Sequence, residues 1–448
     1  FNLAGRLPRK SNEKFRHGLS VLDPTCGSGA FLFAALGILK PLYDATLRTL
    51  QAVRTDTLIA GEKSSPEKWA EVDELLARFA AAGSERAQDY AVIKHIIVNN
   101  LYGVDIEKQA TEIAKLRLFL KLVALLEPGD DIEPLPDIDF NIRHGNTLVG
   151  YATADETEKA VRGTVAGKLA AQGSLLGDDW DNIQIELIAV EQQYNNFQIQ
   201  QVQRGGQISA EEKQALTATL AKLEDALNLH LAREYGVNTK RTKEFTAWKS
   251  SHQPFHWYVD FYPMMAGGGF DAVIGNPPYV QLSEVSDYGV SRYSCADCGN
   301  LYAVVLERCV ALTKSAGRSG FIVPVSAIST DGYRSLQSIY AALRVHVSCF
   351  DDRPSRLFDG LEHIRLVIAL AERTSAPQWL MTRYYKWTAE ERSSLFNRMS
   401  YFSAPRSPIP NAIPKVGDMI ESSILQKVRA SGSPIASHLV RGSESSLS

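Results

Sequence analysis

The segment SVLDPTCGSGAFL at residues 20–32 decides the expected fold. It begins with a short apolar run, Ser20 to Pro24, passes through a turn with two glycines, Gly27 and Gly29, and enters the apolar stretch from Ala30 to Leu39. This order predicts a strand, a tight loop and a helix. Glycines let the backbone approach a ligand where a Cβ atom would collide, and open α/β sheets bind nucleotide-like ligands at the carboxyl ends of their strands.

The glycine turn differs from the best-known nucleotide fingerprints. It does not match the G-x-G-x-x-G spacing of dinucleotide sites, and the chain contains no G-x-x-x-x-G-K-[ST] phosphate loop. These differences argue against NAD and ATP as ligands. Taken alone, the turn is equally compatible with a simple tight connection between a strand and a helix.

A second strand and helix are predicted at residues 100–126. Asn100 to Asp105 (NLYGVD) has the pattern of a strand, and Ile106 to Leu126 that of a long amphipathic helix. Asp105 ends this strand where the acidic residues of Rossmann-type sites accept hydrogen bonds from a ribose diol. The alternative is that Asp105 caps the helix that starts at Ile106, because aspartate is a common helix cap.

Further strands and helices alternate along the chain, interrupted by two long helical segments. The alternating elements are a short strand and loop at 139–150, a strand at 270–274, a helix at 300–313, and strands at 320–325 and 345–350. The segments 43–99 and 155–249 have helical patterns with few strand formers. We therefore predict an α/β fold, with a doubly wound mixed sheet and large helical insertions.

The tetrapeptide Asn276-Pro277-Pro278-Tyr279 directly follows the strand FDAVI and is the predicted catalytic centre. Its two prolines stiffen the loop and leave carbonyls for an outside donor. An exocyclic amino group fits this loop: acceptance of its hydrogens by Asn276 Oδ1 and the Pro277 carbonyl would localise its lone pair for attack on an electrophilic methyl group. Tyr279 would stack on the base, a contact worth about 1–3 kcal/mol. The alternative is a tyrosine that closes the end of the sheet.

Composition bounds the class of protein. The 448 residues, of which 45% are hydrophobic, allow a large core and two or three domains. The formal net charge is -3, so any contact with DNA depends on local basic patches. No run approaches the ~20 apolar residues that span a bilayer, and five dispersed cysteines indicate a reducing compartment. We therefore expect a cytoplasmic protein without a membrane contact.

The cysteines and histidines predict no metal site. Cys295 and Cys298 have C-x-x-C spacing, but a structural zinc site normally takes two such pairs. No H-E-x-x-H helix occurs, and the placement of Asp105 to Lys108 favours ribose binding over metal binding. A cytosine-C5 methyltransferase is also disfavoured, because its nucleophile is usually the cysteine of a Pro-Cys pair and the chain has no such pair.

The ordered motifs resemble those of one enzyme family. DPTCGSGAFL followed by GVD, GNTL and NPPY is similar to the gamma-order adenine-specific DNA methyltransferases, and the resemblance extends over residues 20–373. It is strongest to the large methylases of type IIG restriction-modification systems and to PglX, the methylase of the BREX phage-defence system. The resemblance implies a class I, Rossmann-like methyltransferase fold, S-adenosylmethionine as cofactor, double-stranded DNA as substrate, and other subunits of a defence system as partners.

The resemblance also implies roles for single residues of the cofactor loop. The methionine part of the cofactor would lie against Asp23, Gly27 and Gly29. The further contacts expected from the same loop are Pro24, Cys26 and Phe31.

Other cofactor and base contacts are implied outside that loop. Asp105 would bind the ribose beside Ile106, and Asn146 would contact the adenine of the cofactor, at a position where relatives more often carry Asp. Phe358, in RLFDG, lies where the family often places an aromatic ring against the other face of the flipped target adenine. Phe350 and Phe358 are alternatively core residues.

The implied reaction is direct transfer. The adenine is rotated out of the duplex, and its N6 attacks the sulfonium methyl in line, without a covalent enzyme intermediate. Two other interpretations stay open. A methyltransferase could use the same tetrapeptide on an RNA base or a protein glutamine, since any planar amino group fits at Asn276. Alternatively, the chain is chiefly a DNA-binding part of a defence complex whose catalysis is weak or depends on partners.

These patterns divide the chain into six segments. Phe1 is not an initiator methionine, which is compatible with a fragment or a processed form, and the Tyr-Thr-Pro type of cofactor motif that relatives usually carry before the first strand does not occur. The segments are 1–42, the first β-α unit with the cofactor loop; 43–99, a helical insertion; 100–154, cofactor-binding β-α units; 155–249, a second helical insertion; 250–375, the catalytic half; and 376–448, a linker toward a target-recognition region.

Overall fold

The computed structural model divides into two compact units. The first lies within residues 1–276, 286–290 and 308–317, and the second within 277–285, 291–307 and 318–448. The residues that the structure describes are 3, 17–59, 66–80, 84–126, 135–163, 176–203, 209–285, 288–358, 363–404 and 412–431.

The first unit contains a parallel sheet with the strand order β3-β2-β1-β4. Leu22 of β1 pairs with Tyr102 of β2 on one side and with Val273 of β4 on the other. Because all these strands are parallel, their carboxyl ends meet at one edge of the sheet, where α/β folds place their ligands. The strands are β1 (Val21–Asp23), β2 (Leu101–Asp105), β3 (Ile142–His144) and β4 (Phe270–Gly275).

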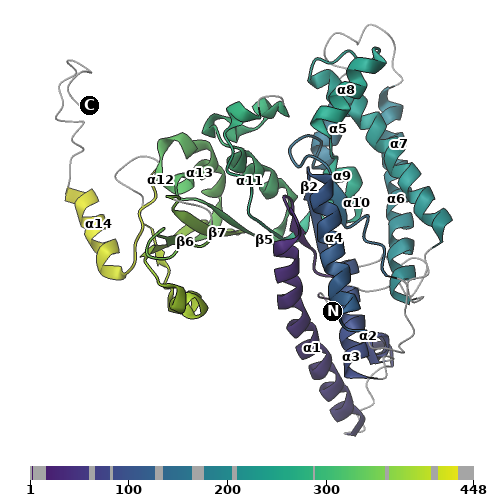
Figure 1. Ribbon diagram of the computed structural model, residues 1–448, viewed down its shortest axis with the longest axis horizontal. Coiled ribbons are helices and arrows are strands. Elements are labelled where there is room, and N and C mark those ends of the chain that lie inside the picture. The colour runs from purple at the N-terminus through teal and green to yellow at the C-terminus, as the bar shows by residue number, and fades with distance from the viewer. Residues whose placement is uncertain are drawn as a thin grey trace. The chain divides into compact units, whose positions relative to one another are not determined.

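Helices α1 (Ala30–Ile59), α3 (Glu85–Asn99) and α4 (Lys108–Val123) pack with these strands into one core. Figure 1 shows α1 and α4 side by side, and α2 (Pro66–Ala80) lies against α1 and α3. Each buried aliphatic side chain of this core contributes about 1.5–3 kcal/mol by leaving water. Among the fully buried members are Leu32 and Leu36 of α1, Ile96 and Ile97 of α3, and Leu118 and Leu122 of α4.

Helix α1 differs from the expectation that no segment is apolar and long enough to cross a membrane. Its part Ala30–Asp56 meets that criterion by length and composition. The signal is weak, because core helices of other proteins meet it as well. One face of α1 carries buried core residues, including Leu39, Tyr43 and Leu47, and the window that meets the criterion is 33% buried.

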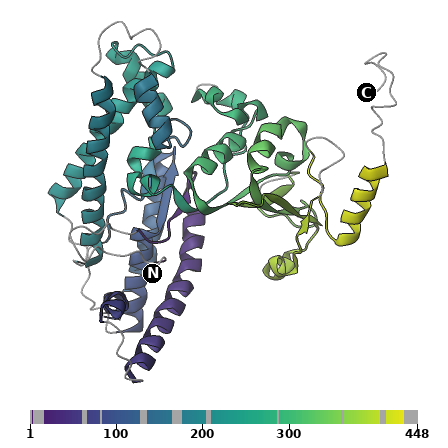
Figure 2. The ribbon, with the colours of Figure 1, turned by 180° about the vertical axis from the view of Figure 1, so that it is seen from behind.

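The second helical segment forms a long antiparallel pair. Figures 1 and 2 show α6 (Leu176–Gln203) and α7 (Ala210–Glu234) lying along each other. Leucines at three- and four-residue spacing, Leu216, Leu220 and Leu223, bury one stripe of α7. The remaining helices of this part are α5 (Ala154–Gly163), α8 (Thr242–His252), α9 (Trp257–Asp260) and α10 (Tyr262–Ala266).

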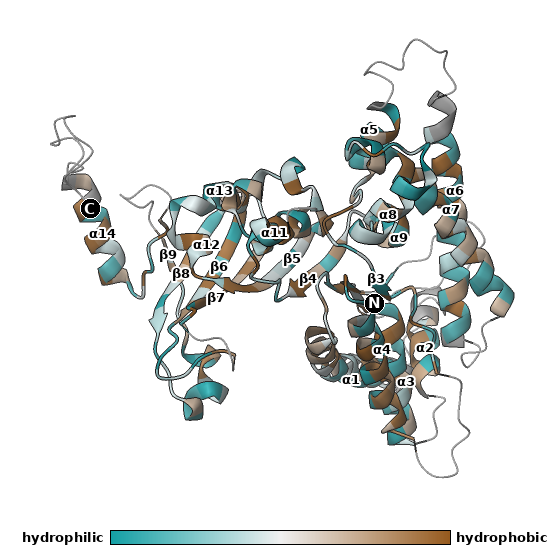
Figure 3. Ribbon diagram, turned by 45° about the horizontal axis from the view of Figure 1, so that its top comes forward, coloured by the Kyte–Doolittle hydropathy of each residue, from teal (hydrophilic) through white to brown (hydrophobic). Residues whose placement is uncertain are grey.

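The second unit is built on the strand order β5-β7-β6-β8-β9. Strand β7 lies antiparallel between β5 and β6, and β8 is parallel to β6. Figure 3 colours β7 (LVIALAER) as hydrophobic over most of its length, which agrees with its place inside the sheet. The strands are β5 (Thr313–Pro324), whose first residues belong to the first unit, β6 (Leu343–Phe350), β7 (Leu366–Arg373), β8 (Gln378–Tyr385) and β9 (Phe402–Ser403).

Short helices fill the connections of this second sheet. Helix α11 (Leu301–Leu312) leads into β5, and α13 (Arg334–Tyr340) leads into β6. The others are η1 (Leu282–Glu284), η3 (Val290–Arg292), η4 (Ser294–Cys298), α12 (Ser326–Ser329), η5 (Asp331–Tyr333), η6 (Ala389–Ser394), η7 (Phe396–Arg398) and α14 (Met419–Ser431).

The predicted α/β fold with a mixed sheet and helical insertions is confirmed. Two predicted segment borders differ from the observed elements. The border between residues 42 and 43 falls inside α1, which continues past Pro41 because Tyr43 and Leu47 extend its buried core face. Residues after 376, predicted as a linker, add β8 to the sheet, because Met381 and Thr382 of β8 are fully buried. The proline-rich and serine-rich ends of that segment, 405–411 and 432–448, lie outside the described residues.

Candidate active site

The loop between β1 and α1 is a tight turn closed by its own backbone. Gly27 and Gly29 both have positive φ, +51° and +79°, which other residues rarely adopt. The Gly29 amide donates to the Cys26 carbonyl at 2.8 Å, and the Cys26 amide donates to the Val104 carbonyl of β2 at 2.9 Å. A Cβ atom on Gly29 would lie 3.0 Å from that of Ala114, whereas no atom lies within 4 Å of that position at Gly27. The turn is therefore packed on one side and open at Gly27.

Asp105 holds this turn in place. One carboxylate oxygen, Oδ2, accepts the Gly27 amide at 2.7 Å, and the other, Oδ1, accepts the Glu107 amide at 2.9 Å at the entry to α4. The alternative prediction, that Asp105 caps a helix starting at Ile106, is wrong, because α4 begins at Lys108 and its N-cap is Glu107. A carboxylate offers about four acceptor positions, so both oxygens keep capacity for a ribose hydroxyl. Ile106 follows, half-buried, with its carbonyl 3.0 Å from a His144 ring nitrogen.

Asp23 is buried at the end of β1. Its side chain accepts the Thr25 amide at 3.1 Å, and only 1% of the residue is exposed. Burial raises the pKa of Asp23 to about 7, the Thr25 hydrogen bond opposes the rise, and the nearby Asp105 adds to it. Such a carboxyl changes charge near neutral pH, which suits a group that would meet a cationic ligand.

The other predicted loop residues have packing or backbone roles. Burial raises the pKa of the Cys26 thiol, so this cysteine stays neutral and behaves as a small core residue. The Pro24 carbonyl accepts the Thr147 hydroxyl, and the Thr147 carbonyl accepts the Trp257 indole N–H at 3.0 Å. Phe31 is half-buried in the first turn of α1. Sequence reasoning missed Thr147 and Trp257, although GNTL was among the motifs that carried the resemblance.

Asn146 presents a buried donor that has no hydrogen-bond partner. Its Oδ1 accepts the Leu148 amide at 3.0 Å, which fixes the orientation of the side-chain amide, while Nδ2 bonds to nothing. The residue is only 3% exposed, and an unsatisfied buried donor costs about 1–3 kcal/mol. An acceptor nitrogen of an adenine ring would satisfy it. The Gly27 opening, the Asp105 carboxylate and this donor together fit the adenosyl and ribose groups of S-adenosylmethionine.

The predicted catalytic tetrapeptide begins at the same sheet edge. Asn276 directly follows β4, and β4 is paired with β1, whose carboxyl end bears Asp23 and the glycine turn. Asn276 is half-buried, and the border between the two compact units falls between Asn276 and Pro277. Pro277 is buried and Pro278 is exposed.

Tyr279 is held at two places in the second unit. Its hydroxyl donates to the Ile322 carbonyl of β5 at 2.9 Å, and burial raises the pKa of the phenol. The Tyr279 and Tyr302 rings meet edge to face at 5.9 Å, and Tyr302 in turn stacks on Tyr333 at 5.4 Å. These contacts give the half-buried Tyr279 ring a defined orientation.

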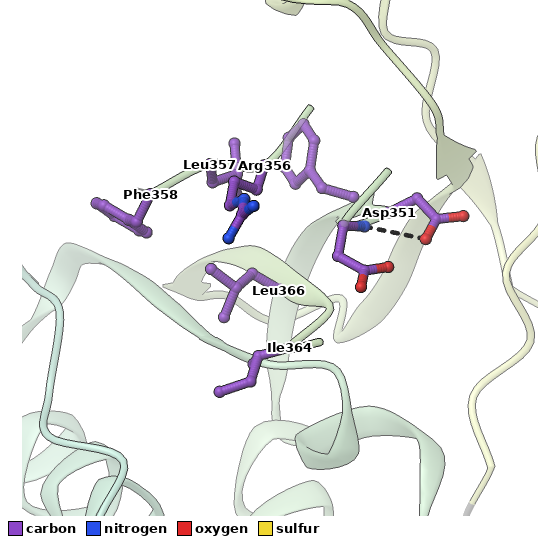
Figure 4. Close-up of a pocket in the computed structure, with 8 residues that line it drawn as sticks. Asp351, Arg356, Leu357, Phe358, Ile364 and Leu366 are labelled. Atoms are coloured by element: carbon purple, nitrogen blue, oxygen red, sulfur yellow. Dashed lines mark hydrogen bonds between the residues drawn. The ribbon is translucent and has the colours of Figure 1, made fainter. Parts of the chain in front are cut away.

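Phe358 lines a small hollow of about 10 Å³ in the second unit, which has room for about one water molecule. Figure 4 shows it with Leu357, Ile364 and Leu366. Phe350, which was weighed as its alternative, is fully buried in a small core cluster with Trp387 and Leu395, whereas Phe358 is half-buried. The structure therefore separates the two rings: Phe350 is a core residue, and Phe358 stays a candidate for contact with a base.

Cys295 and Cys298 are both buried in η4, and the Cys298 thiol donates to Asp297 Oδ1 at 3.5 Å. Among the residues that the structure describes, no three His, Cys, Asp or Glu side chains are grouped to hold a metal ion.

A pH prediction follows from Asp23. Because its folded-state pKa of about 7 lies above the usual aspartate pKa of 3.8, the folded protein holds a proton between these two pH values that the unfolded chain releases. This group therefore lowers the free energy of unfolding as pH rises from 4 to 7, by up to about 4 kcal/mol. We expect Asp23→Asn to lose less stability than the wild type between pH 5 and pH 8 in urea titrations. If the free energy of unfolding changed equally with pH in the two proteins, Asp23 would not be the buried carboxyl with a raised pKa.

Two families of restriction-modification methylases match parts of this chain. Residues 99–348 match the model of the Eco57I restriction-modification methylase family, and residues 10–125 match that of the MmeI DNA-methyltransferase domain. RM.MjaORFECS2P of Methanocaldococcus jannaschii, named as a type II restriction enzyme and methyltransferase, is 27% identical over 356 residues, which cover 69% of this chain. The chain spans about a quarter of that relative, 26% of its length.

Two solved structures show weaker likeness. The DrdV–DNA complex has a TM-score of 0.41 and 10% identity, covering 87% of this chain and 28% of that one. The M protein of the type I restriction enzyme EcoKI has a TM-score of 0.32 and 11% identity, covering 89% of this chain and 51% of that one. Scores this low carry no argument about function. The fold itself is the α/β fold with a mixed sheet that the sequence predicts.

Proposed function

This chain belongs to the Eco57I restriction-modification methylase family, and from that membership we propose that it transfers a methyl group from S-adenosylmethionine to N6 of an adenine in double-stranded DNA. The observation that carries the proposal is the shared edge of the first sheet. Asn276 leaves β4 beside the end of β1, where Asp23 and the glycine turn lie. An acceptor for an amino group and a loop suited to the cofactor thus come from neighbouring strands.

The proposed chemistry needs two acceptors and a defined geometry. S-adenosylmethionine supplies, when bound, an electrophilic methyl group on a sulfonium. Asn276 Oδ1 and the Pro277 carbonyl accept the two N6 hydrogens of adenine, which localises the nitrogen lone pair and points it in line with that methyl. The prolines at 277 and 278 limit the loop to few conformations, so little ordering is left to the reaction step.

The proposed cofactor contacts follow the observed hydrogen bonds. Asp23 faces the ammonium group of the methionine part, Asp105 accepts from the ribose, and Asn146 donates to the adenine ring. Asn146 differs here from the Asp that relatives more often carry, because its Nδ2 is a donor, whereas an ionised carboxylate only accepts. The remaining contacts of the loop and its neighbourhood are assigned to Pro24, Cys26, Gly27, Gly29, Phe31 and Ile106.

The proposal also covers the methyltransferase group, the cellular compartment and the partners of this chain. The order of the motifs, with the cofactor loop before the catalytic tetrapeptide, supports the gamma group of adenine methyltransferases. We infer that the chain works with duplex DNA in the cytoplasm, alongside other parts of a restriction-modification or phage-defence system. A BREX system with a PglX-like methylase is one such setting.

Nucleoside mass spectrometry tests the proposal directly. The protein is incubated with isotope-labelled S-adenosylmethionine and genomic DNA, and the DNA is digested and scanned for methylated nucleosides. Labelled N6-methyladenine is the expected product. Labelled N4-methylcytosine would overturn the adenine assignment, and label only in RNA or protein would overturn the DNA assignment. Binding of DNA without transfer of label would favour a DNA-binding subunit.

Tyr279 offers a test of base stacking. Tyr279→Phe loses the hydrogen bond to Ile322 but keeps the ring, so we expect near-normal methylation and a stability loss of about 1 kcal/mol. Tyr279→Ala removes the ring, and we expect kcat/KM to fall by about 5- to 150-fold, the equivalent of 1–3 kcal/mol. Steady-state kinetics with DNA as the varied substrate measure both. Equal losses in the two variants would show that the hydroxyl, and not the ring, matters.

A further inference from the structure

A second hollow, of about 520 Å³ and open to solvent, lies at one edge of the second sheet. It is formed where three strands end and one begins. Val325 follows β5, Asp351 follows β6 and Lys386 follows β8, while Arg365 directly precedes β7. In α/β sheets this carboxyl edge is where ligands bind. The other lining residues are Asp352, Arg353 and His363.

The negative charges of this hollow are mostly buried, and its positive charges are exposed to solvent. The side chains of Asp351 and Asp352 are 11% and 14% exposed, whereas those of Arg365 and Lys386 are 55% and 73% exposed. The carboxylates thus form the floor, and the cationic ends form the rim. An approaching ligand meets positive charge first, which selects an anion.

Arg365 is held in a fixed orientation. Its Nε donates to Asp351 Oδ1 at 3.0 Å, and its guanidinium carbon lies 5.8 Å from the centre of the Tyr384 ring. The Arg365 carbonyl accepts the Val325 amide at 2.9 Å, so the backbone is anchored as well. Engagement through Nε leaves the two terminal nitrogens as donors in the planar arrangement that matches two phosphate oxygens.

The hollow adjoins the one that contains Phe358. Asp351 and Asp352 line both hollows, and both hollows belong to the second unit. A nucleotide whose base reaches Phe358 would therefore have a backbone phosphate near the Arg365 rim.

We propose that Arg365 and Lys386, oriented by Asp351, bind a backbone phosphate of the DNA strand that carries the target base. This inference rests on the proposed function, because it takes duplex DNA as the ligand. It assigns to this rim a positioning contact, which is independent of sequence and sensitive to salt. Its role is to hold the strand while the base is turned toward the tetrapeptide.

The test compares two arginine variants of the full chain in DNA binding. Fluorescence anisotropy with a labelled duplex, in the absence of cofactor, gives the affinity over a series of salt concentrations. We expect Arg365→Gln to bind about tenfold more weakly at low salt and to lose about 0.9 from the slope of log affinity against log salt, as for one lost phosphate contact. Arg318→Gln is the matched control, because Arg318 is 78% exposed in the same unit and also pairs with a carboxylate, Glu372.

Lys386→Gln is a second variant, which shows whether a loss of DNA affinity in Arg365→Gln comes from misfolding. Lys386 is 73% exposed, so its replacement leaves the fold intact, and we expect a smaller loss of the same slope. Unchanged slopes in both Arg365→Gln and Lys386→Gln, or the same loss in Arg318→Gln, would overturn the inference. If the Arg365→Gln variant has the smaller slope but the unchanged protein methylates no DNA, the phosphate site stands and only the methyltransferase proposal is refuted.

Discussion

Replacing Asn276 by alanine is expected to lower kcat for DNA methylation by about 10²–10³-fold, with the KM for the cofactor nearly unchanged. The reason is that the side-chain oxygen would act on the amino group only as it becomes nucleophilic, so its loss raises the barrier without weakening binding. Single-turnover transfer of label from S-adenosylmethionine to DNA, at saturating concentrations of both, measures the step directly.

Two further variants make the Asn276 result specific. Asn276→Asp keeps an oxygen acceptor and is expected to retain more activity than Asn276→Ala. Asn238→Ala changes an exposed asparagine of the same unit and is expected to behave as the wild type. A kcat within a fewfold of the wild type in Asn276→Ala, with normal thermal unfolding, would remove Asn276 from the catalytic centre and with it the central step of the proposal.

Replacing Gly150 by alanine is expected to destabilise the first unit by about 3 kcal/mol or more, which is a large share of the stability of a typical protein. Gly150 has φ of +142°, and a Cβ atom there would lie 1.9 Å from the Phe255 carbonyl oxygen. Both atoms are backbone or fixed to it, so no side-chain rotation relieves the clash. The Gly150 carbonyl also accepts from Arg308 at 3.2 Å, so the shift would disturb a buried arginine.

Gly37→Ala is the control for Gly150→Ala. Gly37 lies in helix α1 with no atom within 4 Å of its Cβ position, so alanine there is expected to stabilise the protein by about 0.5–1 kcal/mol. Urea unfolding of the two variants should therefore move in opposite directions. Because Asn146 and Thr147 lie in the same loop as Gly150, the Gly150 variant is also expected to bind S-adenosylmethionine less well by isothermal calorimetry. A variant of normal stability would mean that Phe255 can move.

Local patterns were sufficient for the elements that carry the site. Strands β1, β2 and β4 are mainly apolar runs. Asp23 and Asp105 are the last residues of β1 and β2, and Asn276 directly follows β4. Such runs predict buried parallel strands whatever their neighbours are. Because parallel strands have their carboxyl ends at one sheet edge, the order of the motifs predicts that these three polar residues lie at the same edge.

The sequence by itself determined the fold class, the glycine turn after β1 and the place of the tetrapeptide after β4, because apolar period, glycine and proline act within a few residues of one another. Tertiary structure alone decided four things that depend on residues far apart in the chain. It joined Asp105 to Gly27, left Asn146 Nδ2 without a partner, and placed β8 beside β6 where a linker was predicted. It also brought Arg365 over Asp351 at the ends of separate strands. Burial and strand pairing create such contacts, and no local pattern encodes them.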